Sequence, residues 1–112
     1  MGHFDLYKKF NREGDLFNER NDRVYSSGLK AIEQLKDKPC IFEVNTGAKP
    51  RGYRDDAYPS DEFISEIAKN KPLFVVNADA HRKESLLTDI ESTTVKLQKA
   101  GYKTVKNLIE IL

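Results

Sequence analysis

Apolar positions separated by three residues predict the first helix of the chain. Leu29, Ile32 and Leu35 recur at this spacing in a segment that is otherwise mostly polar. This spacing is typical of a helix with one buried face. We place the helix at about residues 22–37, with Asp22 as a possible N-cap.

Two further helices are predicted by the same kind of pattern. Residues 60–70 begin with Ser60, a favourable N-cap, and continue with acidic side chains in the first turn. Residues 83–100 form the third predicted helix. It ends before Gly101, because glycine readily adopts the left-handed conformation that often follows a helix.

Three short runs rich in apolar and β-branched residues predict strands at 40–45, 73–78 and 103–105. The first two runs are nearly continuous in apolar residues, which is typical of strands buried inside a parallel sheet. Residues 107–112 are also largely apolar, and the pattern does not assign them to a helix or a strand.

Helices and strands alternate along the chain, so the predicted fold class is α/β. We expect parallel β/α units, with helices covering both faces of the sheet. The loops with the most unusual polar residues follow the first two predicted strands at their carboxyl ends. Ligands and catalytic groups collect at this edge in parallel α/β folds.

Composition narrows the class of protein and its partners. The 112 residues are 38% hydrophobic and 33% charged, as expected for one small globular domain. The net charge is +1 and both signs are interspersed, which argues against a nucleic-acid or acidic-membrane partner. No apolar run approaches the ~20 residues of a membrane span. The single cysteine forms no internal disulfide, so we expect a cytoplasmic protein.

The first candidate site is the sequence "FVVNADAH" at residues 74–81. Asp79 and His81 alternate with a small residue, so both can point to the same side of an extended strand end. Carboxylate oxygen and imidazole nitrogen suit Zn, Mn or Fe. A helix cap next to a surface histidine is an equally ordinary interpretation of these residues.

The second candidate site is the N-terminal sequence "GHFDLYKKFN". His3 and Asp5 repeat the alternation, in the reverse order. A frayed terminus or part of an expression tag is the alternative interpretation. The apolar and patterned residues that follow are unlike a tag.

The third candidate site is the sequence "EVNTGAKPRGYRDDAYPS" at residues 43–60. Asn45 lies near the end of the first strand, and Arg51 and Arg54 follow in a loop rich in glycine and proline. The planar donors of arginine match phosphate oxygens, so two arginines in one loop indicate an anion site. Alternatively, Asp55 and Asp56 simply neutralise them in a solvated loop.

Together these sequences resemble the C-terminal part of the polymerase and histidinol phosphatase (PHP) superfamily, and are most similar to PHP-type histidinol phosphatases. The resemblance covers almost the whole chain. It lies in "GHFD" and "KFN" at 2–5 and 9–11, "EVNT", "RGYR" and "YPS" at 43–46, 51–54 and 58–60, and "DAH" at 79–81.

The resemblance implies a distorted (β/α)7 barrel with a metal cluster at the carboxyl ends of its strands. It implies metal-assisted hydrolysis of a phosphomonoester, L-histidinol phosphate, in histidine biosynthesis. By position, it assigns His3, Asp79 and His81 as ligands of divalent Zn, Mn or Fe, Arg51 and Arg54 as phosphate-binding residues, and Asn45 to the pocket wall.

The family's N-terminal H-x-H motif has no counterpart, and the chain has two histidines, His3 and His81. A full barrel needs ~250 residues. We therefore expect residues 1–112 to be a single partial PHP domain, the C-terminal part of a barrel. It would be inactive alone, with an exposed sheet edge available to another chain. The alternatives are a non-catalytic α/β scaffold or binding module derived from a PHP domain, and an unrelated small α/β domain.

Overall fold

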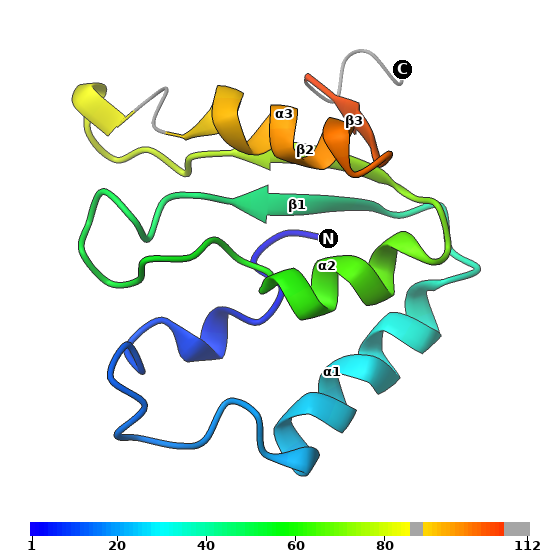
Figure 1. The fold of residues 1–112 in the computed structure, drawn as a ribbon, viewed down its shortest axis with the longest axis horizontal. Coiled ribbons are helices and arrows are strands. Elements are labelled where there is room, and N and C mark those ends of the chain that lie inside the picture. The colour runs from blue at the N-terminus through cyan, green and yellow to red at the C-terminus, as the bar shows by residue number, and fades with distance from the viewer. Residues whose placement is uncertain (86–88, 107–112) are drawn as a thin grey trace.

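The computed structural model describes residues 1–85 and 89–106 and shows a small α/β protein with a parallel sheet (Figure 1). Strands β1 (Ile41–Asn45), β2 (Leu73–Asn77) and β3 (Lys103–Val105) lie in that order across the sheet. Both neighbouring pairs are parallel. The predicted α/β class and all three predicted strands are therefore confirmed.

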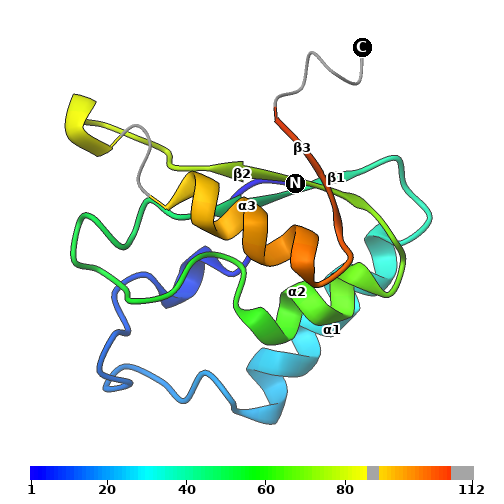
Figure 2. The same cartoon turned by 45° about the horizontal axis from the view of Figure 1, so that its top comes forward.

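The helices are α1 (Asp22–Leu35), α2 (Asp61–Ala68) and α3 (Ile90–Lys99), and two short 3₁₀ turns lie at Leu6–Lys8 and Lys83–Ser85. Each α-helix precedes or connects strands, as the alternation predicted (Figure 2). The predicted final segment, 107–112, lies outside the described residues.

Three details of the helix ends differ from the predictions. Asn21, not Asp22, caps α1, because its side chain accepts a hydrogen bond from the Arg23 N–H. Ser60 precedes α2 as predicted but makes no side-chain cap hydrogen bond. The third helix begins at Ile90 rather than at residue 83, where there is only a 3₁₀ turn. Gly101 has φ 86°, which agrees with its predicted position after a helix.

The core lies on one face of the sheet. Phe42 and Phe74 are buried there, and they pack with apolar side chains of the helices such as Ile67 and Leu97. Burial alternates along β2 and along β1 as far as Val44, and Ile41 and Val75 on the other face are only half-buried. The prediction of helices on both faces is therefore wrong for the described residues, because apolar strand composition alone does not show what covers each face.

The two edges of the sheet differ. The N-terminal residues run beside β1, where the Glu43 N–H donates to the Met1 carbonyl at 2.9 Å. In the described residues, β3 pairs with β2 alone. None of the described helices is long and apolar enough to cross a membrane.

Candidate functional site

The strongest candidate site lies at the carboxyl end of β1 and β2, where His3 and Asp79 meet. The His3 Nε2 atom is 3.2 Å from Asp79 Oδ2, although 76 residues separate them in the sequence. The pairing of the N-terminal residues with β1 brings His3 to this edge. Glu43 also holds His3 at this edge, because the Glu43 Oε2 atom accepts a hydrogen bond from the His3 backbone N–H at 2.9 Å.

Both residues of this pair have an unusual backbone conformation. His3 has φ 55° and Asp79 has φ 45°, in the left-handed region that costs free energy for residues other than glycine. Such conformations persist where the surrounding contacts hold them, and they are concentrated at functional sites. Asp79 lies two residues beyond the end of β2, and its carboxylate contacts His3.

Arg51 joins the pair from the loop after β1. Its Nη2 atom donates to the Asp79 carbonyl, lies 2.8 Å from His81 Nδ1, and is 3.7 Å from Asp79 Oδ2. Burial raises the pKa of the Asp79 carboxyl, but the contact with His3 and the charge of Arg51 outweigh this effect and lower it. Asp79 is therefore ionised at neutral pH and can act as a ligand for a cation.

His81 lies next to this group, with its role set by which ring nitrogen carries the proton. Its Nδ1 atom is 2.8 Å from the Asp79 carbonyl as well as from Arg51. If Nδ1 is protonated it donates to the carbonyl, and Nε2 keeps a lone pair for a metal ion. If Nδ1 accepts from Arg51 instead, Nε2 carries the proton and cannot bind a metal ion.

A cavity of about 160 Å³ lies among these residues. Its walls include His3, Arg51, Asp79 and His81, and Asn45 also lines it. Five of the six predicted site residues therefore meet in one place. In the part of the chain that the structure describes, no three His, Cys, Asp or Glu side chains form a metal-binding group. His3 and Asp79 are in contact, and the ring of His81 is turned toward Arg51.

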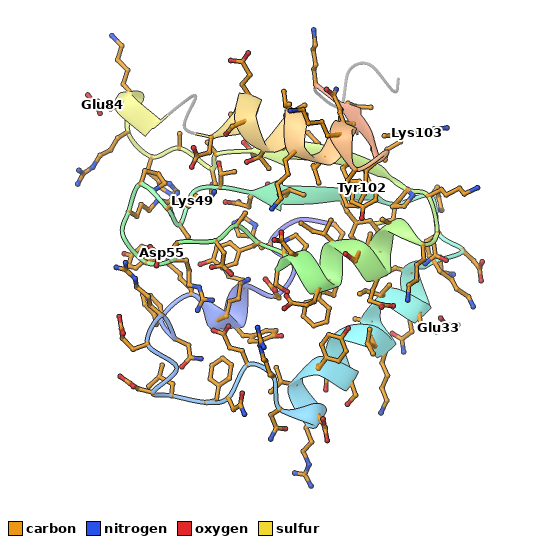
Figure 3. The ribbon with its side chains drawn as sticks, in the orientation of Figure 1. Glu33, Lys49, Asp55, Glu84, Tyr102 and Lys103 are labelled. Carbon is orange, nitrogen blue, oxygen red and sulfur yellow. The ribbon has the colours of Figure 1, made fainter. Side chains whose placement is uncertain are left out.

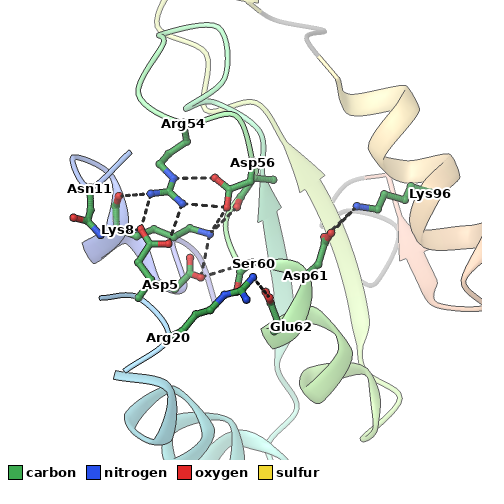
Figure 4. Close-up of polar contacts among 12 residues, drawn as sticks. Asp5, Lys8, Asn11, Arg20, Arg54, Asp56, Ser60, Asp61, Glu62 and Lys96 are labelled. Atoms are coloured by element: carbon green, nitrogen blue, oxygen red, sulfur yellow. Dashed lines mark hydrogen bonds and ion pairs between the residues drawn. The ribbon is translucent and has the colours of Figure 1, made fainter. Parts of the chain in front are cut away.

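Arg54, the sixth predicted site residue, lies in a different cluster (Figure 4). Its guanidinium donates to both carboxylate oxygens of Glu19, at 2.6 and 3.1 Å, and to both of Asp56, at 2.8 and 3.3 Å. It also donates to the Lys8 carbonyl at 3.1 Å. The donors of Arg54 are engaged, so in this structure it ties the loop after β1 to the N-terminal region.

The same cluster contains a buried lysine and two carboxylates. Lys8 Nζ is 3.0 Å from Asp56 Oδ2 and 3.3 Å from Asp5 Oδ2. Burial raises the pKa of Asp56, but hydrogen bonds from Arg54 and Lys8 outweigh this effect and lower it. Asp5 shows the opposite balance. Burial raises the pKa of Asp5, and this effect outweighs Lys8 and the Ser60 N–H, which both lower that pKa.

Charged side chains also surround the carboxyl edge of the sheet. Lys49, Asp55 and Glu84 all lie toward the end of the molecule to which β1 points, whereas Tyr102 and Lys103 lie at the opposite end (Figure 3). The candidate site is therefore at the edge where parallel α/β folds place their ligands.

Lys9 and Tyr58 are among the residues that line the cavity although the sequence pattern did not assign them to the site. Lys9 was present in the N-terminal cluster, but nothing in the pattern indicated its direction. Tyr58 forms an isolated antiparallel bridge with Asn45, and a contact of this kind between a strand end and a later loop leaves no periodic signal in the sequence.

No family model, curated protein or solved structure matches this chain. The fold and the geometry of the site show an α/β protein with a polar cavity at the carboxyl edge of its sheet.

Proposed function

We propose that this chain is the C-terminal part of a metal-dependent phosphomonoester hydrolase of the PHP superfamily, with L-histidinol phosphate as its substrate. The observation that carries the proposal is the 3.2 Å contact between His3 and Asp79. It joins two of the motifs on which the family resemblance rests, and it lies at the edge of the sheet where the resemblance places a metal cluster.

The half-buried second face of the sheet supports the finer fold proposal. In a (β/α) barrel the helices cover the outer face of the strands, and the other face lines the barrel interior. Ile41 and Val75 are half-buried on that second face. We propose that further strands, supplied by another chain or segment, cover them and extend the sheet at the edge of β3.

The donor atoms fit a divalent metal ion in part. His3 supplies a ring nitrogen and Asp79 a carboxylate, a combination suited to Zn, Mn or Fe. When its Nδ1–H donates to the Asp79 carbonyl, His81 keeps a lone pair on Nε2, but in the described residues it does not form a group of three ligands with His3 and Asp79. We propose that the remaining ligands of the cluster come from outside these 112 residues.

The chain's own residues would position the substrate. A divalent ion, when bound, would lower the pKa of a water ligand and withdraw charge from the phosphate oxygens. Arg51 lies beside Asp79 and lines the cavity, so its guanidinium can donate to the phosphate. Asn45 can donate through its amide nitrogen, and Glu43 keeps His3 in place through the backbone hydrogen bond.

The second candidate function is a non-catalytic module derived from a PHP domain. It is favoured by one specific observation: in the described residues no three potential ligands form a metal-binding group. This candidate keeps the scaffold and the polar cavity but not the hydrolytic chemistry.

A titration with Mn²⁺ separates these functions without depending on turnover. The chain has only two histidines, so their imidazole NMR signals are readily distinguished. We expect Mn²⁺ to broaden the signals of His3 and His81 in the native chain but not in Asp79→Ala. Asp55→Ala is the matched control, because Asp55 is exposed and pairs with Arg12 outside the cavity.

Two outcomes of this experiment contradict the metal site. One is a native chain whose imidazole signals are unaffected by Mn²⁺, and the other is an equal response in Asp79→Ala. The same samples, assayed for hydrolysis of histidinol phosphate, test the reaction. Because we expect the isolated chain to be inactive, the assay also includes the candidate N-terminal part of a PHP domain as a partner.

A further inference from the structure

Two side chains that line the candidate cavity each have a buried polar atom without a partner. Asn45 is 2% exposed and Tyr58 is 3% exposed, and both line the cavity. In the described residues, neither Asn45 Nδ2 nor Tyr58 Oη has a hydrogen-bond partner. Buried polar groups in native proteins are rarely left unpaired, so each of these atoms calls for a partner that the chain does not provide.

Hydrogen bonds hold the backbones of both residues and the side chain of Asn45 in place. The Asn45 N–H donates to the Tyr58 carbonyl at 2.6 Å, and the Tyr58 N–H donates to the Asn45 carbonyl at 2.9 Å. The Asn45 Oδ1 atom accepts the Gly47 N–H at 2.9 Å. This bond assigns the amide orientation and leaves Nδ2 as the donor that faces away from Gly47.

Both unpartnered atoms are available as donors at neutral pH. An amide nitrogen has two N–H groups and no lone pair to accept with. Burial raises the pKa of the Tyr58 hydroxyl to about 12, so it keeps its proton. The ligand that satisfies both must therefore supply acceptor oxygens.

Charges around the cavity favour an anion. Lys9 and Arg51 both line it. Lys9 Nζ lies 4.6 Å from the ring centre of Tyr53 and 5.0 Å from that of Phe10, so two aromatic rings hold the ammonium near the cavity. Asp79, the one carboxylate among the described residues of the wall, is already paired with His3 and Arg51.

We propose that Tyr58 and Asn45 donate hydrogen bonds to a tetrahedral oxyanion of the phosphate class, whose charge Lys9 and Arg51 balance. This inference rests on the proposed function and deepens it, because it adds Tyr58 and Lys9 to the substrate-binding residues. A phosphate group has enough acceptor oxygens for all four donors, whereas a carboxylate has two oxygens. It also makes anion binding independent of a metal ion.

The test is a calorimetric titration of the chain with inorganic phosphate in the presence of a chelator. A parallel titration uses acetate. We expect phosphate to bind more tightly than acetate. Tyr58→Phe removes only the hydroxyl, and we expect it to weaken phosphate binding about tenfold, as the loss of one hydrogen bond to a charged ligand does. Tyr102→Phe, at the opposite end of the sheet, is the matched control and should bind as the native chain does.

Thermal unfolding separates binding from folding. In the absence of phosphate, Tyr58→Phe should unfold at the same temperature as the native chain or at a higher one, because it removes a buried hydroxyl that has no partner. Added phosphate should stabilise the native chain more than the variant. Lys9→Gln provides a second variant that does not change a buried side chain, and we expect it to weaken phosphate binding as well.

The inference is overturned if the native chain does not bind phosphate, or if Tyr58→Phe and Lys9→Gln bind it as tightly as the native chain. These outcomes are distinct from failure of the proposed function. Phosphate binding that depends on Tyr58, without any Mn²⁺ response, would overturn only the metal-dependent hydrolase. A Mn²⁺ response that depends on Asp79, without phosphate binding, would overturn only the present inference.

Discussion

Replacement of Arg54 by alanine tests whether this arginine holds the fold or binds substrate. Its side chain is 10% exposed, and it is paired with Glu19 and Asp56, whose side chains are 31% and 45% exposed. Loss of one partner from a buried ion pair costs ~3–5 kcal/mol, because the other charge stays buried and unpaired. Since both carboxylates are partly exposed and can regain water, we expect Arg54→Ala to lower the free energy of unfolding by about 3 kcal/mol, the lower end of this range.

Urea unfolding followed by circular dichroism measures this free energy directly. A loss of about 3 kcal/mol corresponds to a thermal midpoint lower by roughly 10–20 °C in a domain of this size. Arg12→Ala is the matched control. Its pair with Asp55 is much more exposed, at 49% and 82%, so we expect it to change the free energy of unfolding by less than about 1 kcal/mol.

Two results would refute this reasoning about Arg54. If Arg54→Ala unfolds at the same urea concentration as Arg12→Ala, the ion-pair cluster does not stabilise the fold. If Arg54→Ala keeps its stability but no longer binds phosphate, Arg54 is a substrate-binding residue, as the family resemblance implied, and the arrangement in Figure 4 is not its working one.

Three other substitutions test the fold and its charges. Ile67→Ala removes a side chain that is 1% exposed in the core, and we expect it to cost ~2–5 kcal/mol in urea unfolding; a cost below about 1 kcal/mol would contradict its place in the core. Asn21→Ala should cost about 1 kcal/mol, because it removes the cap hydrogen bond of α1, while Ser60→Ala should cost less because it removes none; equal costs would contradict these caps. The lowered pKa of Asp56 adds stability that is present above the unfolded-state pKa and is lost as the pH falls through the lower folded-state value. Asp56→Asn should therefore reduce the loss of stability on acidification below pH ~4, and an unchanged pH dependence would count against the ion pairs of Asp56.

Local patterns were enough to predict the three α-helices and three strands of this fold, although not the residue at which the third helix begins. Helix periodicity, strand composition and the glycine at 101 depend on residues close together in the sequence, and these are the features that the structure confirms. Alternation of helices and strands also predicted the parallel sheet, because parallel neighbours need a connection that crosses over the sheet. The parallel arrangement of the strands also predicted that the two candidate loops lie at the same edge of the sheet.

The covering of the sheet was not predictable in this way. Strands with nearly continuous apolar residues suggested helices on both faces, yet Ile41 and Val75 remain half-buried on one of them. What covers a face depends on where each helix packs after its loop. Strand composition records how apolar a face is, but not which element lies against it.

The two arginines of the loop after β1 show the same limit at the candidate site. Arg51 and Arg54 are three residues apart and looked equivalent as phosphate-binding residues. The irregular path of the loop directs Arg51 to Asp79 and Arg54 to Glu19 and Asp56. A helix or strand would have related their directions by its period, but a loop has no such period.

The sequence by itself therefore determined the elements, their order, the parallel sheet and the edge of the sheet at which the candidate site lies, because these depend on local periodicity and chain connectivity. Only the tertiary structure decided that His3 meets Asp79 across 76 residues, and that Tyr58 lies against Asn45 in the wall of the same cavity. Such contacts depend on how the N-terminal segment and the loop after β1 pack against the strand ends. That packing is a property of the whole chain and leaves no local pattern to read.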